Sequence, residues 1–118
     1  MTTKEVADRL VAFCRQGKIE DAQKELFAED SVSIEPNDSM GPRETIGLEA
    51  IKKKGEMFNS MMENFYGATI SEPLIAGDCF SIAWEMDAQM KGHERMMMSE
   101  ICVYKVKDGK VISEQFFF

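Results

Sequence analysis

The chain has 118 residues, a formal net charge of −7 at pH 7 and 44% apolar residues. This length predicts a single domain over residues 1–118, large enough to bury one core, and the composition disfavours disorder. An acidic surface repels phosphate backbones and anionic lipid, so neither nucleic acid nor a membrane is an expected partner. No apolar run approaches the ~20 residues of a membrane helix, and no signal-peptide pattern precedes the first helix.

The cysteines and the histidine disfavour a metal centre. Cys14, Cys79 and Cys102 are odd in number and far apart in the sequence, so they predict neither a disulfide framework nor a zinc site. His93 is the one histidine, and it lies in an expected turn. We therefore expect reduced thiols in a cytoplasmic protein, with no metal and no cofactor.

The N-terminal half predicts helices followed by short strands. Thr2 and Glu5 have the spacing of a capping box, and the helix that they begin should end near Gly17. A shorter helix follows over residues 19–26. A strand over 31–35, a loop over 37–42 and a short strand over 43–46 come next.

A third helix is predicted from Gly47 onward. Its apolar residues recur every three or four positions as far as Phe65, which indicates one continuous helix with a buried face. The run Lys52-Lys53-Lys54 is expected to be solvated.

The last third of the chain predicts three long strands joined by turns at residues 91–94 and 107–110. Asp108-Gly109 between apolar runs is a strong hairpin signal. Strands of this length curve, so we expect an α+β fold: a cone-shaped antiparallel sheet whose concave face is covered by the three helices of the N-terminal half. Both sheet faces carry apolar residues, which predicts a homodimer through the convex face, with Trp84 or with Ile101 and Val103 at the contact.

The order of these elements resembles the nuclear transport factor two-like superfamily. The segments that resemble family motifs are Phe27 to Val32, Ile34-Glu35-Pro36, Ile46 to Ile51 and Glu100 to Ile112. The last of these is similar to the C-terminal pattern of the SnoaL-like group, relatives of ketosteroid isomerases and polyketide cyclases. The resemblance covers the whole chain.

The resemblance implies catalytic roles for two carboxylates. Glu35 lies where ketosteroid isomerases have the base that moves a proton beside a carbonyl. The family's protonated acid would fall near Glu100 or Cys102. The family's tyrosine on the first helix is replaced here by Leu10. Glu35 and Glu100 are therefore the candidate catalytic residues.

An apolar small molecule is the expected ligand. The residues expected to line its pocket are Leu10, Phe13, Cys14, Phe58, Met62, Met98, Cys102 and Tyr104. The ten methionines either line an adaptable cavity or fill the core, and core filling is the favoured interpretation.

Two functions remain open at this point. One is cofactor-independent proton transfer on a small apolar carbonyl compound, of the isomerase, cyclase or dehydratase type. The other is a non-catalytic domain that binds a small molecule or serves as a dimeric scaffold.

Overall fold

The computed structural model describes residues 1–118 and contains three helices and seven strands. The helices are α1 (Thr3–Arg15), α2 (Ile19–Leu26) and α3 (Leu48–Ser60). The strands are β1 (Phe27–Ile34), β2 (Glu44–Ile46), β3 (Met62–Ile70), β4 (Leu74–Ala76), β5 (Cys79–Met90), β6 (Arg95–Lys107) and β7 (Lys110–Phe117). No helix has the length and apolar character needed to cross a membrane.

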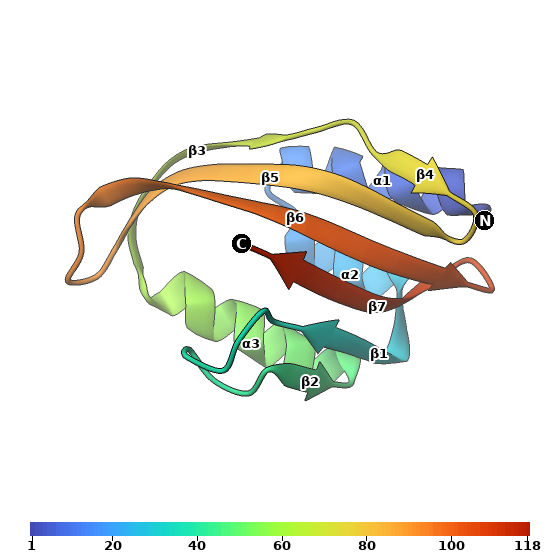
Figure 1. The fold of residues 1–118 in the computed structure, drawn as a ribbon, viewed down its shortest axis with the longest axis horizontal. Coiled ribbons are helices and arrows are strands. Elements are labelled where there is room, and N and C mark those ends of the chain that lie inside the picture. Colours follow the sequence, from blue (N-terminus) through green and yellow to red (C-terminus); the bar gives the residue numbers. More distant parts are fainter.

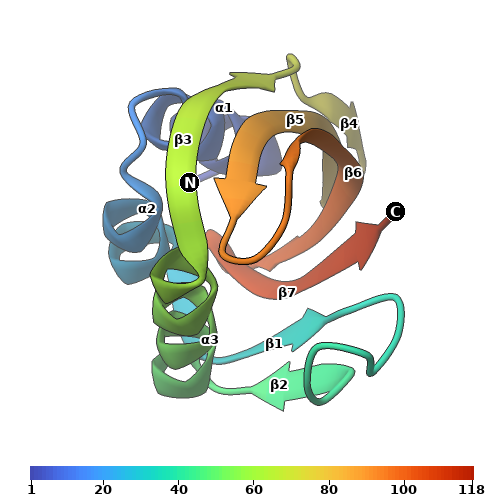
Figure 2. The ribbon, with the colours of Figure 1, turned by 90° about the vertical axis from the view of Figure 1, so that its left-hand side faces the viewer.

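The strands form one curved sheet in the order β2-β1-β7-β6-β5-β3, with β4 paired to β5. All neighbouring strands are antiparallel except β1 and β7, which are parallel. α1 and α2 lie behind the sheet in Figure 1, and α3 runs beside β1 and β2. Seen from the end, the sheet curls with all three helices on its concave side (Figure 2). The predicted α+β cone is therefore confirmed.

The amphipathic face of α1 forms one side of the core. Thr2 and Glu5 make the predicted capping box, in which each side chain accepts a hydrogen bond from the other residue's backbone N–H. The buried residues of this helix are Val6, Ala7, Leu10, Val11 and Cys14. They pack against inner residues of β5 and β6 such as Phe80 and Tyr104, so α1 covers the narrow end of the concave face.

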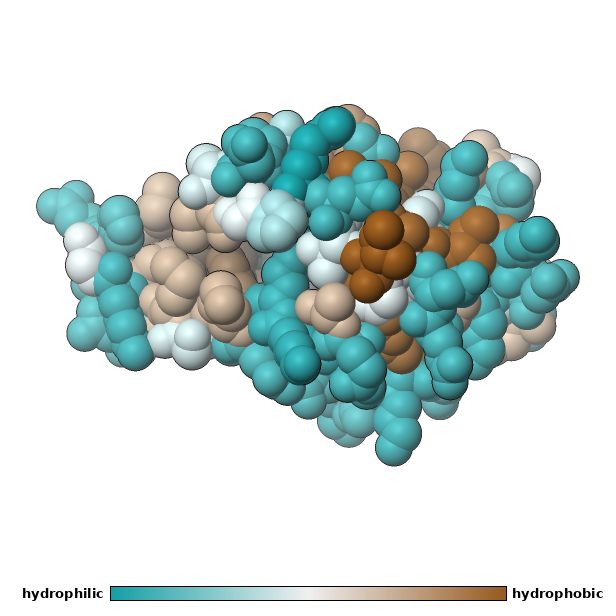
Figure 3. Space-filling model, turned by 90° about the horizontal axis from the view of Figure 1, so that it is seen from below, coloured by the Kyte–Doolittle hydropathy of each residue, from teal (hydrophilic) through white to brown (hydrophobic).

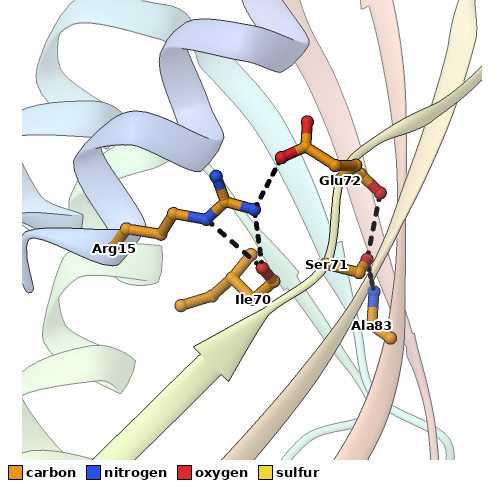
Figure 4. Close-up of polar contacts among 5 residues, drawn as sticks. All are labelled: Arg15, Ile70, Ser71, Glu72 and Ala83. Carbon is orange, nitrogen blue, oxygen red and sulfur yellow. Dashed lines mark hydrogen bonds and ion pairs between the residues drawn. The ribbon is translucent and has the colours of Figure 1, made fainter.

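A side-chain clasp joins the end of α1 to the corner between β3 and β4 (Figure 4). The Arg15 guanidinium donates two hydrogen bonds to the carbonyl oxygen of Ile70, at 2.9 and 3.3 Å, and one to Glu72 at 3.0 Å. Next to it, the Ser71 hydroxyl accepts a hydrogen bond from the backbone N–H of Ala83 at 2.8 Å. Because Ile70 is buried, its carbonyl needs such a donor where the strand pairing changes.

The third helix is shorter than the sequence predicted. It ends at Ser60, and residues 62–70 form β3, which pairs with β5. Met62 lies opposite Met90 and Phe65 lies opposite Ala88, with a bulge between residues 62 and 64. The extra residue of the bulge puts two positions three apart on the same sheet face. A spacing of three, interpreted as helical, was therefore produced by a bulged strand.

Both predicted hairpins are present. β5 and β6 pair over eleven registered positions up to the turn at residues 91–94, and β6 and β7 are joined at Asp108-Gly109. Asp108 has φ +52° and Gly109 has φ +74°, the left-handed conformation that Asp-Gly turns adopt readily. β1 is longer than predicted, because it begins at Phe27 directly after α2.

The two faces of the sheet differ in burial. Trp84 is on the concave face beside buried Ile82, whereas Ile101 and Val103 point to the convex face. The sequence left open whether Trp84 or the pair Ile101 and Val103 lies on the convex face, and the structure places the pair there. None of the ten methionines is buried, so the expectation that they fill the core was wrong.

Candidate functional site

Glu114 is the most deeply buried carboxyl group of the concave face. It lies on β7, and its backbone is in register with Ser33 of β1 on one side and Tyr104 of β6 on the other. The register of β7 shifts at Ile112, which places Glu114 rather than its neighbours on the inner face. Its side chain is 6% exposed, so a titratable group faces an otherwise apolar layer.

Lys54 connects α3 to this group. Its ammonium donates hydrogen bonds to the Ser33 hydroxyl at 2.5 Å and to the Glu35 carboxylate at 2.9 Å. It also lies 5.4 Å from the centre of the Phe116 ring, within cation–π range. The prediction that the lysine run is solvated was therefore wrong for Lys54, because this position of α3 faces β1 rather than solvent.

Glu100 enters the same region from β6. It lies opposite Trp84 of β5, and its carboxylate accepts a hydrogen bond from the Cys102 thiol at 3.5 Å. Burial raises the pKa of Glu100, and the negative charge of Glu35 raises it further. The Cys102 hydrogen bond and the charge of Lys54 act in the opposite direction.

Among the carboxyl groups, burial raises the pKa of Glu114 most. It raises the pKa of this carboxyl group to about 7, and the charges of Glu35 and Glu100 add to the shift. The Ser33 hydrogen bond and the Lys54 charge oppose it. A carboxyl group whose pKa is raised toward neutral pH can both donate and accept protons under physiological conditions.

The thiol and phenol groups around Glu114 are held neutral. Burial raises the pKa of the Cys14 thiol to about 12, and that of the Cys102 thiol still higher. Tyr104 is fully enclosed, stacks on Phe80 with ring centres 4.8 Å apart, and has a pKa well above its usual value because of burial. These groups form a low-dielectric surround and supply neither a thiolate nor a phenolate.

The predicted pocket residues divide into three groups. Leu10, Cys14, Cys102 and Tyr104 belong to the buried layer around Glu114. Met98, Met62 and Phe58 lie farther along, toward the wide end of the cone, and are half-buried or exposed. Phe13 is partly buried and packs against the edge of the buried layer. Its ring contacts Arg9 at 5.0 Å and borders an outer hollow of about 550 Å³ with Asp21, Lys24 and Glu25.

A second outer hollow, of about 370 Å³, lies along α1 and is lined by Arg15 and Glu72 of the clasp among others. Neither hollow includes Glu35, Glu100 or Glu114. No group of three His, Cys, Asp or Glu side chains is arranged to hold a metal ion.

Sequence reasoning missed three members of the site: Glu114, Lys54 and Ser33. Each had a weak signal. Glu114 lies two residues before Phe116, so both are on the inner face of β7. Ser33 lies two residues before Glu35, which directly follows β1, so these two side chains are on the same side. Lys54 follows buried Ile51 by three residues, so it lies on the same side of α3. Recognising them required the register between β1 and β7, which joins strands about eighty residues apart in sequence.

Comparison with models of known protein families identifies the family of this chain. The family model for the SnoaL-like domain matches residues 1–118. The chain belongs to the SnoaL-like domain family. A search of curated proteins gives no match.

Solved structures agree with this assignment. This SnoaL-like protein is 30% identical to a proposed SnoaL-like polyketide cyclase from Mesorhizobium loti, with a TM-score of 0.93 over 100% of both chains. A cystatin-like protein of unknown function from Xanthomonas campestris is 20% identical, with a TM-score of 0.76 over 99% of this chain and 90% of its own. A hypothetical protein with a ketosteroid isomerase-like fold from Catenulispora acidiphila, solved in complex with trimethylamine, is 20% identical, with a TM-score of 0.74 over 97% of this chain and 85% of its own.

Proposed function

We propose that this SnoaL-like protein catalyses proton transfer on a small apolar carbonyl compound without a cofactor. The observation that carries the proposal is the contrast between two carboxyl groups joined through Lys54 and Ser33. Glu35 is a carboxylate in an ion pair with Lys54, whereas Glu114 is buried and has a pKa of about 7. Environments that separate two carboxyl groups in this way are characteristic of acid–base pairs.

In this proposal, Glu35 acts as the base. Its carboxylate removes a proton from the carbon beside the substrate carbonyl, and the electron pair of that C–H bond moves to form an enolate. Protonated Glu114 donates a hydrogen bond to the enolate oxygen, and the Lys54 ammonium adds positive charge nearby. Return of the proton from Glu35 to another carbon completes an isomerisation. Alternatively, the enolate attacks a second carbonyl of the same molecule and closes a ring, and the alkoxide so formed takes the proton from Glu35.

Glu100 would be the second proton carrier. Its raised pKa and its place opposite Trp84 put a carboxyl group beside an aromatic surface that suits an apolar ring or chain. Family kinship with a proposed polyketide cyclase supports a carbonyl-rich substrate. The positions of Glu35 and Glu100 on this face are consistent with the roles that the sequence suggested for them.

Hydrogen–deuterium exchange tests the proposal. A panel of steroid, aromatic and short-chain ketones is incubated with the protein in D₂O, and loss of the signal of the proton beside the carbonyl is followed by ¹H NMR. We expect exchange above the buffer rate, reduced about 10²–10⁴-fold by Glu35→Gln. Glu114→Gln should also reduce it, because the amide lacks an acidic proton.

Glu85→Gln is the matched control, because Glu85 is an exposed carboxylate on β5 in the same sheet. It should leave exchange unchanged. Exchange that is insensitive to Glu35→Gln contradicts the assigned base. Ligand binding without any exchange would favour the alternative, a binding domain, in which the ion pair with Lys54 is a structural tie between α3 and β1.

A further inference from the structure

Eight of the ten methionines gather at the wide end of the cone. They are Met57 and Met61 near the end of α3, Met62 on β3, Met86 and Met90 on β5, and Met96, Met97 and Met98 on β6, with Met97 on the opposite sheet face from its two neighbours. In Figure 3 a light-brown, moderately hydrophobic area lies just inside the hydrophilic left tip of the molecule, in the part where Figure 1 places the β5–β6 hairpin and the start of β3. This concentration is a property of one region and not of the whole surface.

The strand register shows that several of these side chains converge. Met86 lies directly opposite Met98, and Met96 lies opposite Ala88. Directly opposite residues have Cβ atoms roughly 4.5–5.5 Å apart, and diagonal neighbours such as Met86 and Met96 are about 7–8 Å apart, within reach of long side chains. All three therefore stand on the concave face around one small residue.

The burial of Ala88 indicates where these side chains lie. Ala88 is two residues from the end of β5, near the open end of the sheet, yet its exposure is 0%. Its neighbours in register are Met96 on β6 and Phe65 on β3, both exposed, at 49% and 58%. The register thus places Met86, Met96 and Met98 around the buried Ala88 on one sheet face, and none of the three methionines is itself buried.

We propose that Met86, Met96 and Met98 form a binding site for a soft monovalent cation of the Cu(I) class. Neutral thioethers are ligands that select Cu(I) over harder ions, and three of them from two adjacent strands can surround one ion. Core packing does not account for the cluster, because none of its members is buried. The net charge of −7 raises the local concentration of cations around the protein.

The site is independent of the proposed proton transfer, because it uses no residue assigned to that reaction. It also makes a specific prediction about protons. A thioether has no proton to lose on binding, so its affinity for a cation should not change between pH 5.5 and 7.5. Thiolate and imidazole sites weaken as pH falls.

Substitution by leucine separates the sulfur from the apolar character of the side chain. Leucine has a volume close to that of methionine and preserves packing. The triple variant Met86→Leu/Met96→Leu/Met98→Leu is compared with Met97→Leu, which changes the same strand on its opposite face. Both are made in a Cys79→Ser background, because Cys79 is the one cysteine that is not buried and could bind soft metals itself.

Binding is measured with Ag⁺ as a redox-inert probe and with Cu⁺ under ascorbate, in competition with a chromogenic Cu(I) chelator. We expect stoichiometric binding by the parent and by Met97→Leu, at least a ~10-fold loss in the triple variant, and equal affinity at the two pH values. The ¹³C-methyl NMR signals of Met86, Met96 and Met98 should shift, whereas that of Met97 should not. Unchanged affinity in the triple variant, or no stoichiometric binding by the parent, overturns the proposal.

Discussion

At the scale of single residues, Glu114 combines a functional advantage with a disadvantage for stability. A carboxyl group with a pKa of about 7 is useful for moving protons, but the same burial makes its ionised form unfavourable in the folded protein. The unfolded chain ionises freely near the ordinary value of 4.5. The folded state therefore binds the Glu114 proton more tightly than the unfolded state does.

This difference gives the Glu114→Gln variant a pH-dependent gain in stability. Below about pH 4.5 Glu114 is protonated in both states, so glutamine, which resembles the protonated carboxyl, should change little. Between pH 4.5 and 7 the wild type loses stability as the unfolded state releases the proton, and the variant does not. Above pH 7 the difference should reach on the order of 1–3 kcal/mol in favour of the variant.

Urea denaturation at pH 4.5, 6 and 8 measures this difference. Other carboxyl groups also titrate in this range, so the informative quantity is variant minus wild type at each pH. Glu85→Gln, on the exposed side of β5, should give a difference that stays near zero. A Glu114→Gln variant that is less stable than wild type at pH 8 would show that the carboxylate is stabilised by its Ser33 and Lys54 neighbours more than burial disfavours it.

At the scale of elements, the Arg15 clasp is what joins α1 to the β3–β4 corner. Its two components should contribute unequally. The bonds to the carbonyl of buried Ile70 are partly buried, whereas the Glu72 side chain is 81% exposed and its ion pair is screened by solvent. We expect Arg15→Ala to destabilise the protein by about 1.5–3 kcal/mol and Glu72→Gln by less than about 0.5 kcal/mol.

Thermal unfolding of the two variants measures this contrast. Arg15→Lys is a useful third variant, because a lysine supplies charge without the two-pronged donor geometry. If the carbonyl bonds are decisive, lysine should recover only part of the loss. Equal destabilisation by Arg15→Ala and Glu72→Gln would instead assign the clasp to the ion pair.

The elements also show where pattern reasoning worked. Alternation along β5 and β6 identified both strands and grouped Cys102 with Tyr104 on one face, which the structure shows to be the inner face. The same reasoning failed at Met62 and Phe65, because a bulge changes the spacing on one face from two to three. A bulge is a property of a strand paired with its neighbour, so the segment by itself gave no sign of it.

The candidate site was predictable only in part for a similar reason. Glu35 and Glu100 were identified through family resemblance, and the structure brings Lys54, Ser33 and Glu114 to them. These three meet through the parallel pairing of β1 with β7 and the approach of α3 to β1. Contacts between segments far apart in sequence leave no local periodicity, so the polar network was not visible in the sequence.

At the scale of the whole molecule, the convex face of the sheet is the surface that has no helix over it. Ile101 on β6 and Phe117 on β7 lie opposite each other and are 45% and 48% exposed. Met97, on the same face, is 58% exposed. Neighbouring exposed apolar side chains on one sheet face indicate an interaction surface. We propose that a second copy of the chain covers this face about a two-fold axis.

Ile101→Glu tests this assembly because it places a charge at the proposed contact without altering the helix-covered face. Light scattering at micromolar concentration should give twice the chain mass of 13.4 kDa for wild type and the single chain mass for the variant. Met40→Glu, in the exposed loop after β1, should remain dimeric. A wild-type monomer would contradict the proposal. Because Ile101 and Glu100 are adjacent on β6 but point to opposite faces, loss of the dimer with intact proton exchange would also show that each subunit completes its own site.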